Sequence, residues 1–294
     1  MLKKFTGTGV ALVTPFHKHG TVDFSSLEKL VEHLISNGIN YLVVLGTTGE
    51  TATLSSDEKN AVIDFVTDIV GKRVPVVVGM GGYNTQEIIN RMHDFNFENV
   101  DAILSVTPYY NKPQTRGLYL HYKTIADSCP VPVILYNVPG RTCVNLTAET
   151  VLTLANEHSN IIGIKEASGN LSQIMYLIRN KPKNFLVISG DDNLTLPILA
   201  MGGDGVISVV ANAFPAEFSE MVNWGLKSNI IKAREIHYKL QPFMEAIFAD
   251  GNPAGIKAAL ELLGICQNTL RLPLVKVNKQ VHNTIDSILN DLLK

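Results

Sequence analysis

A short apolar run rich in β-branched residues recurs along most of the chain, and each run is followed by a segment whose apolar residues have helical spacing. This alternation restricts the fold more than any other feature, because near-continuous apolar strands indicate burial on both faces of a parallel sheet. The predicted strands are Val10–Val13, Tyr41–Leu45, Val74–Val78, Ala102–Val106, Val133–Tyr136, Ile161–Lys165, Leu186–Ser189 and Gly205–Val210.

The segments between these strands have the patterns of amphipathic helices. One helix starts near Ser55, which has capping-box spacing to Glu58. A doubly wound open sheet alternates in the same way, but about eight strand–helix units in roughly 225 residues, without a dinucleotide fingerprint, favour an α/β fold of the (β/α)8 TIM barrel class. The other helices are predicted at Phe24–Ser36, Thr85–Phe95, Arg116–Ala126, Thr147–Asn156, Leu171–Arg179, Leu194–Met201 and Glu217–Leu226.

The strand pattern disappears from about Ile230 onward. The segments Ile230–Phe248, Pro253–Leu263 and Lys279–Leu293 are each predicted to be helical. We therefore expect residues 1–227 to form a catalytic (β/α)8 barrel and residues 228–294 to form a C-terminal helical region. No Pro/Ser-rich linker separates the two parts, which predicts one compact unit with an appendage.

The composition excludes several classes of protein. Hydrophobic residues make up 46% of the chain, charged residues 18%, and the formal net charge is −2, so no basic patch indicates nucleic acid or an anionic membrane. No window reaches the roughly 18 apolar residues of a membrane span, and no signal-peptide pattern follows the basic N-terminus, so a cytoplasmic location is expected. Cys129, Cys143 and Cys266 form no CxxC pair and are expected to be buried, unreactive thiols.

Chemistry in such a barrel is expected at the C-terminal ends of the strands and in the loops that follow. Thr47 and Thr48 follow the second strand between glycines, where backbone N–H groups and hydroxyls can bind a carboxylate; a tight turn is the alternative. Tyr110 follows the fourth strand and Tyr136 ends the fifth, where a tyrosine is often a core aromatic residue with a solvated hydroxyl. Arg141 follows a Pro-Gly turn and could equally be a solvated loop charge.

Lys165 ends the sixth strand, although a charge is costly to bury there. Counting in twos places Ile161, Gly163 and Lys165 on one face of the strand. If that face points into the barrel, Gly163 leaves room beside the lysine, and the apolar environment favours the free amine that attacks a carbonyl. A lysine that extends to the barrel rim is the alternative.

Two carboxylates, Asp191 and Asp192, follow the seventh strand. Paired carboxylates can bind a divalent cation. No histidine or third acid lies nearby in the sequence, so the indication of a metal site is weak.

Five segments at predicted strand ends form one ordered set: Gly46–Leu54, Val106–Asn111, Leu135–Thr142, Ile164–Gly169 and Ser189–Asp192. With this set the chain resembles the family that contains dihydrodipicolinate synthase and N-acetylneuraminate lyase. The resemblance extends from Phe5 to about Pro273, nearly the whole chain.

The resemblance implies a Schiff-base-forming lyase that condenses pyruvate with L-aspartate 4-semialdehyde in lysine and diaminopimelate biosynthesis, without a metal or other cofactor. Lys165 would form an imine with pyruvate, and the resulting enamine would add to the aldehyde. Tyr136 would transfer protons, relayed through Thr47 and Tyr110. Tyr110 would reach the site from a neighbouring subunit, and the family arrangement implies a homotetramer, a dimer of dimers.

The resemblance also assigns the substrate carboxylates. Thr48 and the backbone of Ile207 would hold pyruvate, and Arg141 would bind the carboxylate of the semialdehyde. N-acetylneuraminate lyases usually lack this arginine and commonly have serine in place of Thr47, so both residues favour the synthase. A related pyruvate-dependent aldolase would leave Arg141 without a role.

A non-catalytic barrel is a further alternative, since a fold alone does not imply a reaction. It predicts the loss of at least one member of the catalytic set, whereas Lys165, Tyr136, Thr47 and Tyr110 are all present.

The resemblance is weaker at the cleft where lysine-inhibited members of the family bind L-lysine. Such members often carry two histidines and an asparagine there, and the matching positions in this chain are Ser56, Lys59 and Tyr83. A cation at Lys59 should repel a lysine ligand, so we expect weak or absent feedback inhibition. The remaining cleft residues fit the family pattern, and they are Thr51, Ala52, Glu87 and Tyr109.

Overall fold

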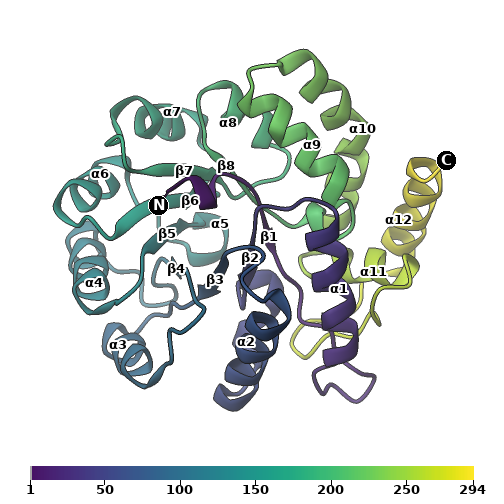
Figure 1. The fold of residues 1–294 in the computed structure, drawn as a ribbon, viewed down its shortest axis with the longest axis horizontal. Helices are drawn as coiled ribbons and strands as arrows, with labels where there is room; N and C mark the ends of the chain where they lie inside the picture. Colours follow the sequence, from purple (N-terminus) through teal and green to yellow (C-terminus); the bar gives the residue numbers. More distant parts are fainter. Residues whose placement is uncertain (1) are drawn as a thin grey trace.

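The computed structural model describes residues 2–294, and its central element is a closed barrel of eight parallel strands in chain order (Figure 1). The first strand pairs with both the second and the eighth, which closes the sheet. The predicted (β/α)8 barrel is therefore confirmed. The strands are β1 (Gly7–Ala11), β2 (Tyr41–Val44), β3 (Val76–Gly79), β4 (Ala102–Val106), β5 (Val133–Asn137), β6 (Ile161–Glu166), β7 (Leu186–Ser189) and β8 (Gly205–Ser208).

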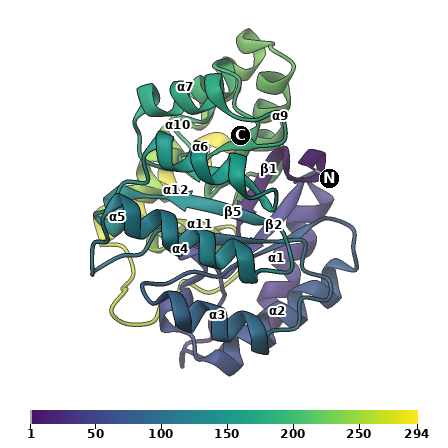
Figure 2. The same ribbon diagram turned by 90° about the vertical axis from the view of Figure 1, so that its left-hand side faces the viewer.

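Helices surround the strands as an outer ring, and the view in Figure 2 shows α3, α4 and α6 lying over the barrel. The predicted capping box is confirmed, since Ser55 and Glu58 each bind the backbone N–H of the other at the start of α2. The helices of the ring are α1 (Phe24–Ser36), α2 (Ser56–Val70), α3 (Thr85–Asp94), α4 (Thr115–Ser128), α6 (Ala148–Glu157), α7 (Leu171–Asn180), α8 (Thr195–Ala200) and α9 (Pro215–Leu226). The short α5 (Pro139–Thr142) follows β5 and lies inside this ring in Figure 1.

The predicted C-terminal extension is confirmed as three helices, α10 (Ile230–Phe248), α11 (Ala254–Leu262) and α12 (Lys279–Leu292). Figure 1 shows them beside α9 and α1, with α12 outermost. Phe243 of α10 packs edge-to-face on Phe214 with ring centroids 4.9 Å apart, so the extension continues the hydrophobic core. The division of the chain at residue 227 stays a prediction.

The first and last strands differ from the predicted ranges. β1 starts at Gly7 instead of Val10, because residues Gly7–Val10 pair with β8 and thereby close the barrel. The first residues of β1 carry little apolar surface of their own. At Gly9 the Tyr41 ring leaves no room for a side chain, since a Cβ there would lie 2.3 Å from the ring. β8 ends at Ser208, and Val210 begins a short 3₁₀ helix, η4 (Val210–Asn212).

The alternation predicted for β6 was wrong at Ile161. The register of β5 against β6 shifts between Val133 and Ile134, so that two residues of β6 oppose one of β5. The buried apolar residues form two hydrophobic clusters. Ile161 accordingly lies in the cluster between the strands and α4, α6 and α7, whereas Ile162 lies in the second cluster together with Ile134. Beyond the shift the count in twos holds, and Lys165 faces the barrel interior with Tyr136.

Two further expectations concern surface properties. Cys129 and Cys266 are buried as expected, but Cys143 is exposed, because it caps α5 in a left-handed conformation with φ of 56°. All three thiols are free. Within residues 2–294 no helix combines the length and the apolarity that crossing a membrane requires.

Candidate active site

Lys165 lies at the C-terminal end of β6, in register with Tyr136 of β5 and Ile188 of β7. Its side chain is buried, and its Nζ lies 4.5 Å from the centre of the Tyr136 ring. None of the ion pairs formed by residues 2–294 includes Lys165. The amine therefore faces an aromatic ring instead of a carboxylate, and the side chain does not extend to solvent at the rim.

The space for Lys165 comes from a glycine other than the predicted one. A Cβ on Gly190 would lie 3.0 Å from both Cγ and Cε of Lys165, so the lysine occupies the room left by the missing side chain. Gly163 is in register with Leu186 of β7, and a Cβ there would meet that residue's carbonyl oxygen at 2.9 Å. Gly163 thus permits the close approach of two strands.

The double-threonine turn follows β2 as a short 3₁₀ helix, η2 (Thr47–Gly49). Thr48 is buried, and its hydroxyl oxygen accepts a hydrogen bond of 3.0 Å from Nδ2 of Asn252. Because the hydroxyl accepts from Asn252, its own O–H is free to be donated to a ligand. Thr47, the residue before Thr48, is only partly buried.

Asn252 is a residue that the sequence reading missed. Its backbone oxygen accepts a hydrogen bond of 3.4 Å from Nη2 of Arg141, so that one residue links Arg141 with Thr48. Its Oδ1 is buried and accepts no hydrogen bond from a protein group. The only signal in the sequence is the dipeptide Asn252-Pro253, which indicates a turn and nothing more.

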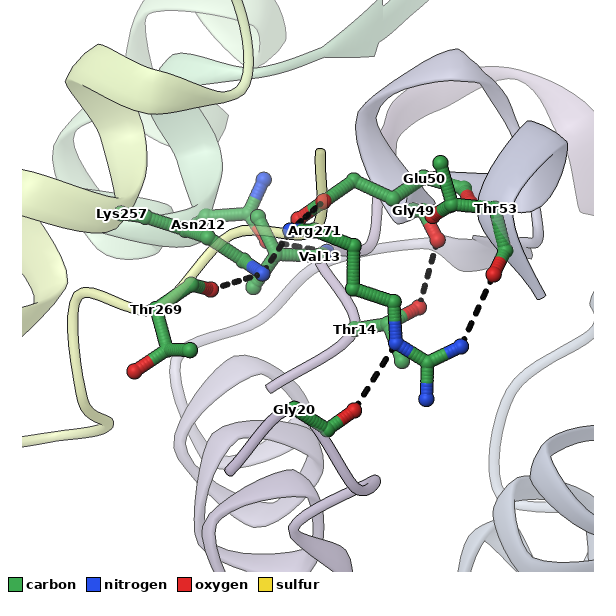
Figure 3. A network of polar contacts seen from close by, with 10 residues as sticks. All are labelled: Val13, Thr14, Gly20, Gly49, Glu50, Thr53, Asn212, Lys257, Thr269 and Arg271. Carbon is green, nitrogen blue, oxygen red and sulfur yellow. Dashed lines mark hydrogen bonds and ion pairs between the residues drawn. The ribbon is translucent and has the colours of Figure 1, made fainter. Parts of the chain in front are cut away.

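Glu50, directly after this turn, joins it to the C-terminal extension (Figure 3). Its buried carboxylate accepts from Nζ of Lys257 and, at 3.1 Å, from the backbone N–H of Arg271. Lys257 also donates to the carbonyl of Thr269 at 2.9 Å, and the Arg271 guanidinium donates to the carbonyl of Thr53 at 2.8 Å. Burial lowers the pKa of Lys257, and the Glu50 carboxylate opposes this shift.

The remaining predicted site residues lie further around the barrel mouth. Ile207 is buried in β8, and Asp192 fixes the turn that follows by accepting from the backbone N–H groups of Val209 at 3.0 Å and Val210 at 3.2 Å. Asp191 accepts from backbone N–H groups of its own loop. No group of three or more His, Cys, Asp or Glu side chains within residues 2–294 is arranged to hold a metal ion.

Tyr110 follows β4 and does not pack against Tyr136 of the same chain. Its side chain is 91% exposed, and its backbone is left-handed with φ of 70°. The Tyr136 carbonyl is held by the neighbouring loop instead, since it accepts from the N–H of Thr107 at 3.0 Å.

Residues 4–292 match the model of the dihydrodipicolinate synthetase family. The chain belongs to this family. It is 50% identical to the 4-hydroxy-tetrahydrodipicolinate synthase of Flavobacterium psychrophilum over 100% of both chains. It also resembles the chloride-inhibited dihydrodipicolinate synthase of Acinetobacter baumannii complexed with pyruvate, with a TM-score of 0.95 and 40% identity over 98% of each chain. The synthase of Cyanidioschyzon merolae with lysine bound matches with a TM-score of 0.95 and 38% identity, again over 98% of each chain.

Most residues predicted for a dihydrodipicolinate synthetase family site gather at one end of the barrel. Lys165 and Tyr136 touch, Thr48 and Arg141 share a partner, and Tyr110 is exposed in the single chain. The roles predicted for these residues go beyond their placement and are taken up as proposals below.

Some of the residues predicted for an allosteric cleft lie near one another in the structure. Tyr83 and Tyr109 pack edge-to-face with ring centroids 5.3 Å apart. Burial lowers the pKa of Lys59, Arg91 lowers it further, and Glu87 opposes the shift, which places all three charges near one another. Arg91 is a second cation beside Lys59 that the sequence reading missed. The other predicted members, Thr51, Ala52 and Ser56, lie in or beside the turn η3 (Thr51–Thr53) and at the start of α2.

Proposed function

We propose that the protein is a 4-hydroxy-tetrahydrodipicolinate synthase, which condenses pyruvate with L-aspartate 4-semialdehyde through an imine at Lys165 in lysine and diaminopimelate biosynthesis. The contact between Lys165 Nζ and the Tyr136 ring, 4.5 Å from its centre, carries the proposal. A buried amine that is free of an ion pair, next to a phenol, is suited to attack a ketone and exchange protons. The names of the relatives support the choice of substrates.

The reaction proceeds in balanced steps on this site. The Lys165 amine adds to C2 of pyruvate, and the carbinolamine loses water to give an iminium. Loss of a proton from C3 gives the enamine, and its C3 forms the new carbon–carbon bond to the aldehyde of the semialdehyde. The amine of that substrate then attacks the imine carbon, which closes the ring and releases Lys165. Tyr136 carries the protons, with Thr47 and Tyr110 as its relay.

The carboxylates fix both substrates. Thr48 donates its free O–H to the pyruvate carboxylate, beside the backbone of Ile207. Arg141 binds the carboxylate of the semialdehyde, since a guanidinium fork suits a planar anion. Asn252 supports the two assignments, because it contacts both Thr48 and Arg141.

Assembly and location complete the proposal. Tyr110 is 91% exposed and lies beside the exposed pair Tyr83 and Tyr109, so a second copy of the chain that covers these rings would insert Tyr110 into a neighbouring site. We accordingly propose a homotetramer built as a dimer of dimers, which acts in the cytoplasm. Sedimentation of the active enzyme measures the first claim, and a fully active monomer contradicts it.

Borohydride reduction in the presence of pyruvate tests the chemistry. We expect a covalent adduct whose mass maps to the peptide that contains Lys165, with Lys165→Met as the matched variant that forms none. Lys257 is the internal control, because it is also buried but is paired with Glu50. Assays with L-aspartate 4-semialdehyde and with N-acetylmannosamine then identify the acceptor. Absence of the adduct contradicts the mechanism, and a preference for N-acetylmannosamine contradicts the substrate assignment.

A further inference from the structure

Asn137 and Glu166 directly follow the two central residues of the site. In the ladder between β5 and β6, Tyr136 is in register with Lys165, and Asn137 is in register with Glu166. Because side chains alternate along a strand, Asn137 and Glu166 point away from the barrel interior, into the layer between strands and helices. Both are buried.

Glu166 is a buried carboxylate that is held by neutral donors. It accepts from Asn137 Nδ2 at 3.2 Å on each oxygen, from Gln173 Nε2 at 3.0 Å and from the backbone N–H of Ser168 at 2.8 Å. None of the ion pairs formed by residues 2–294 includes Glu166. Each of these neighbours donates a hydrogen bond to Glu166, and an ionised carboxylate, which only accepts, fits such surroundings.

Asn137 extends the same network toward the next helix. Its Oδ1 accepts from the backbone N–H of Leu146 at 2.9 Å, and its Nδ2 donates to Asn145 at 2.8 Å. The donor and acceptor ends of this amide are therefore both used, which fixes its orientation. Through Asn137 the end of β5 is tied to the segment that leads into α6, just as Gln173 ties the end of β6 to α7.

Stability alone does not account for this arrangement. Replacing a buried polar cluster by apolar residues of similar volume is often neutral or stabilising, whereas a satisfied polar network selects one geometry. The backbone supports the same reading, because the carbonyl of Glu166 accepts from Gly190, the glycine that lies against Lys165. The network thus fixes the strand end, its neighbour and the space around the amine.

We propose that Asn137 and Glu166 are positioning residues, which hold Tyr136 and Lys165 at the separation needed for imine formation and proton transfer. The inference rests on the proposed function. Neither side chain contacts the substrate: each acts through the residue before it, from the opposite face of the sheet.

Reversal of the hydrogen bond between the two residues tests this inference. Glu166→Gln sets an NH₂ group against the donors around it, and Asn137→Asp sets a second carboxylate against Glu166. We expect each variant to lower kcat and the rate of borohydride-trapped adduct formation by about 10- to 100-fold, since small misplacements of reacting groups have such effects. The KM for pyruvate should change much less, because Thr48 and Ile207 are untouched.

The double variant Asn137→Asp/Glu166→Gln restores a donor opposite an acceptor and keeps the charge of the pair. We expect its kcat to lie within about threefold of the wild-type value, which is a smaller loss than misplaced reacting groups cause. If Glu166→Gln does not give folded enzyme, Gln173→Ala, which removes one donor from the partly exposed edge of the network, should lower kcat by a smaller factor with KM unchanged.

Asp204→Asn is the matched control. Asp204 accepts from Lys181 and from the backbone N–H of Val187 at the opposite end of the barrel, so its loss should lower the melting temperature and leave kcat unchanged. The inference is overturned if the single variants are less stable but keep kcat within twofold of wild type. It is also overturned if the double variant folds but does not recover kcat. Either result leaves the proposed function intact. A wild-type protein that forms no pyruvate adduct overturns both.

Discussion

Lys257 and Glu50 lie 207 positions apart in the sequence and form an ion pair from which solvent is excluded. The pair joins the C-terminal extension to the residue that follows the double-threonine turn. Its charges are further satisfied by the carbonyl of Thr269 and the N–H of Arg271. The face of the Phe16 ring packs against both cations, with Lys257 Nζ at 4.2 Å and the Arg271 guanidinium carbon at 4.5 Å from the ring centre.

Removal of one partner of this pair should be strongly destabilising. In Lys257→Met the Glu50 carboxylate stays buried without its cation, so we expect the free energy of unfolding to fall by about 3–5 kcal/mol. The double variant Lys257→Met/Glu50→Gln should lose less than Lys257→Met alone. Denaturant unfolding of the three proteins measures the difference. Equal stabilities for Lys257→Met and the wild type would show that the buried charge is tolerated without a partner.

Arg141→Ala should impair the second substrate only. Loss of a charge-assisted hydrogen bond to the semialdehyde carboxylate is expected to lower kcat/KM for that substrate by roughly 10²-fold or more, and Arg141→Lys should recover only part of it. Adduct formation with pyruvate should stay at the wild-type rate. Initial-rate kinetics with each substrate varied separately make the comparison, and an equal loss for both substrates argues against the assignment of Arg141.

The stability of the fold should depend on Asp192 below neutral pH. Burial raises the pKa of this carboxyl from 3.8 to about 6, so the folded state binds its proton more tightly than the unfolded state does. The stabilising contribution of the neutral form is therefore complete below pH 3.8 and is lost as the pH rises through about 6.

Asp192→Asn removes this titration. Between about pH 3 and about pH 7, the wild type should lose on the order of 3 kcal/mol of unfolding free energy relative to the variant, with no further divergence above that range. Urea unfolding at several pH values measures the difference between the two proteins. Parallel pH profiles would rule out Asp192 as the titrating group.

Millimolar L-lysine should inhibit the enzyme weakly or not at all. Lys59 and Arg91 place two cations at the predicted cleft, and they oppose the binding of a third, while Glu87 compensates only one. Lys59→Ala should bind L-lysine more tightly than the wild type in calorimetry. Strong inhibition of the wild type would mean that the ligand binds in a way the cation at residue 59 does not affect.

The strands and helices could be predicted wherever the buried positions of an element carry apolar side chains. The range Phe24–Ser36 was predicted with the ends that α1 has, because its apolar stripe and its polar ends coincide. The start of β1 could not be predicted, since Gly7, Thr8 and Gly9 are buried by strand pairing and by the Tyr41 ring instead of by their own side chains. The register shift opposite Val133 is likewise absent from the sequence pattern, and it misplaced Ile161.

A candidate site residue could be recognised where it departs from the apolar pattern of its strand, as Lys165 does. Asn252 and Lys257 carry no such mark, because a turn residue and a helical lysine are common on any surface. Their importance comes from contacts with Thr48 and Glu50 more than 200 positions away. Contacts over that separation depend on the whole topology, and local sequence patterns do not contain them.

The hydrogen bond between Thr48 and Asn252 can form only late in the synthesis of the chain. Residues 47–49 leave the ribosome early, yet the partner that orients the Thr48 hydroxyl is synthesised only after all eight strands. A chain that stalls before residue 252 therefore lacks the amide that donates to the Thr48 hydroxyl. Segments that are translated late thus complete the surroundings of Thr48, a residue near the start of the chain.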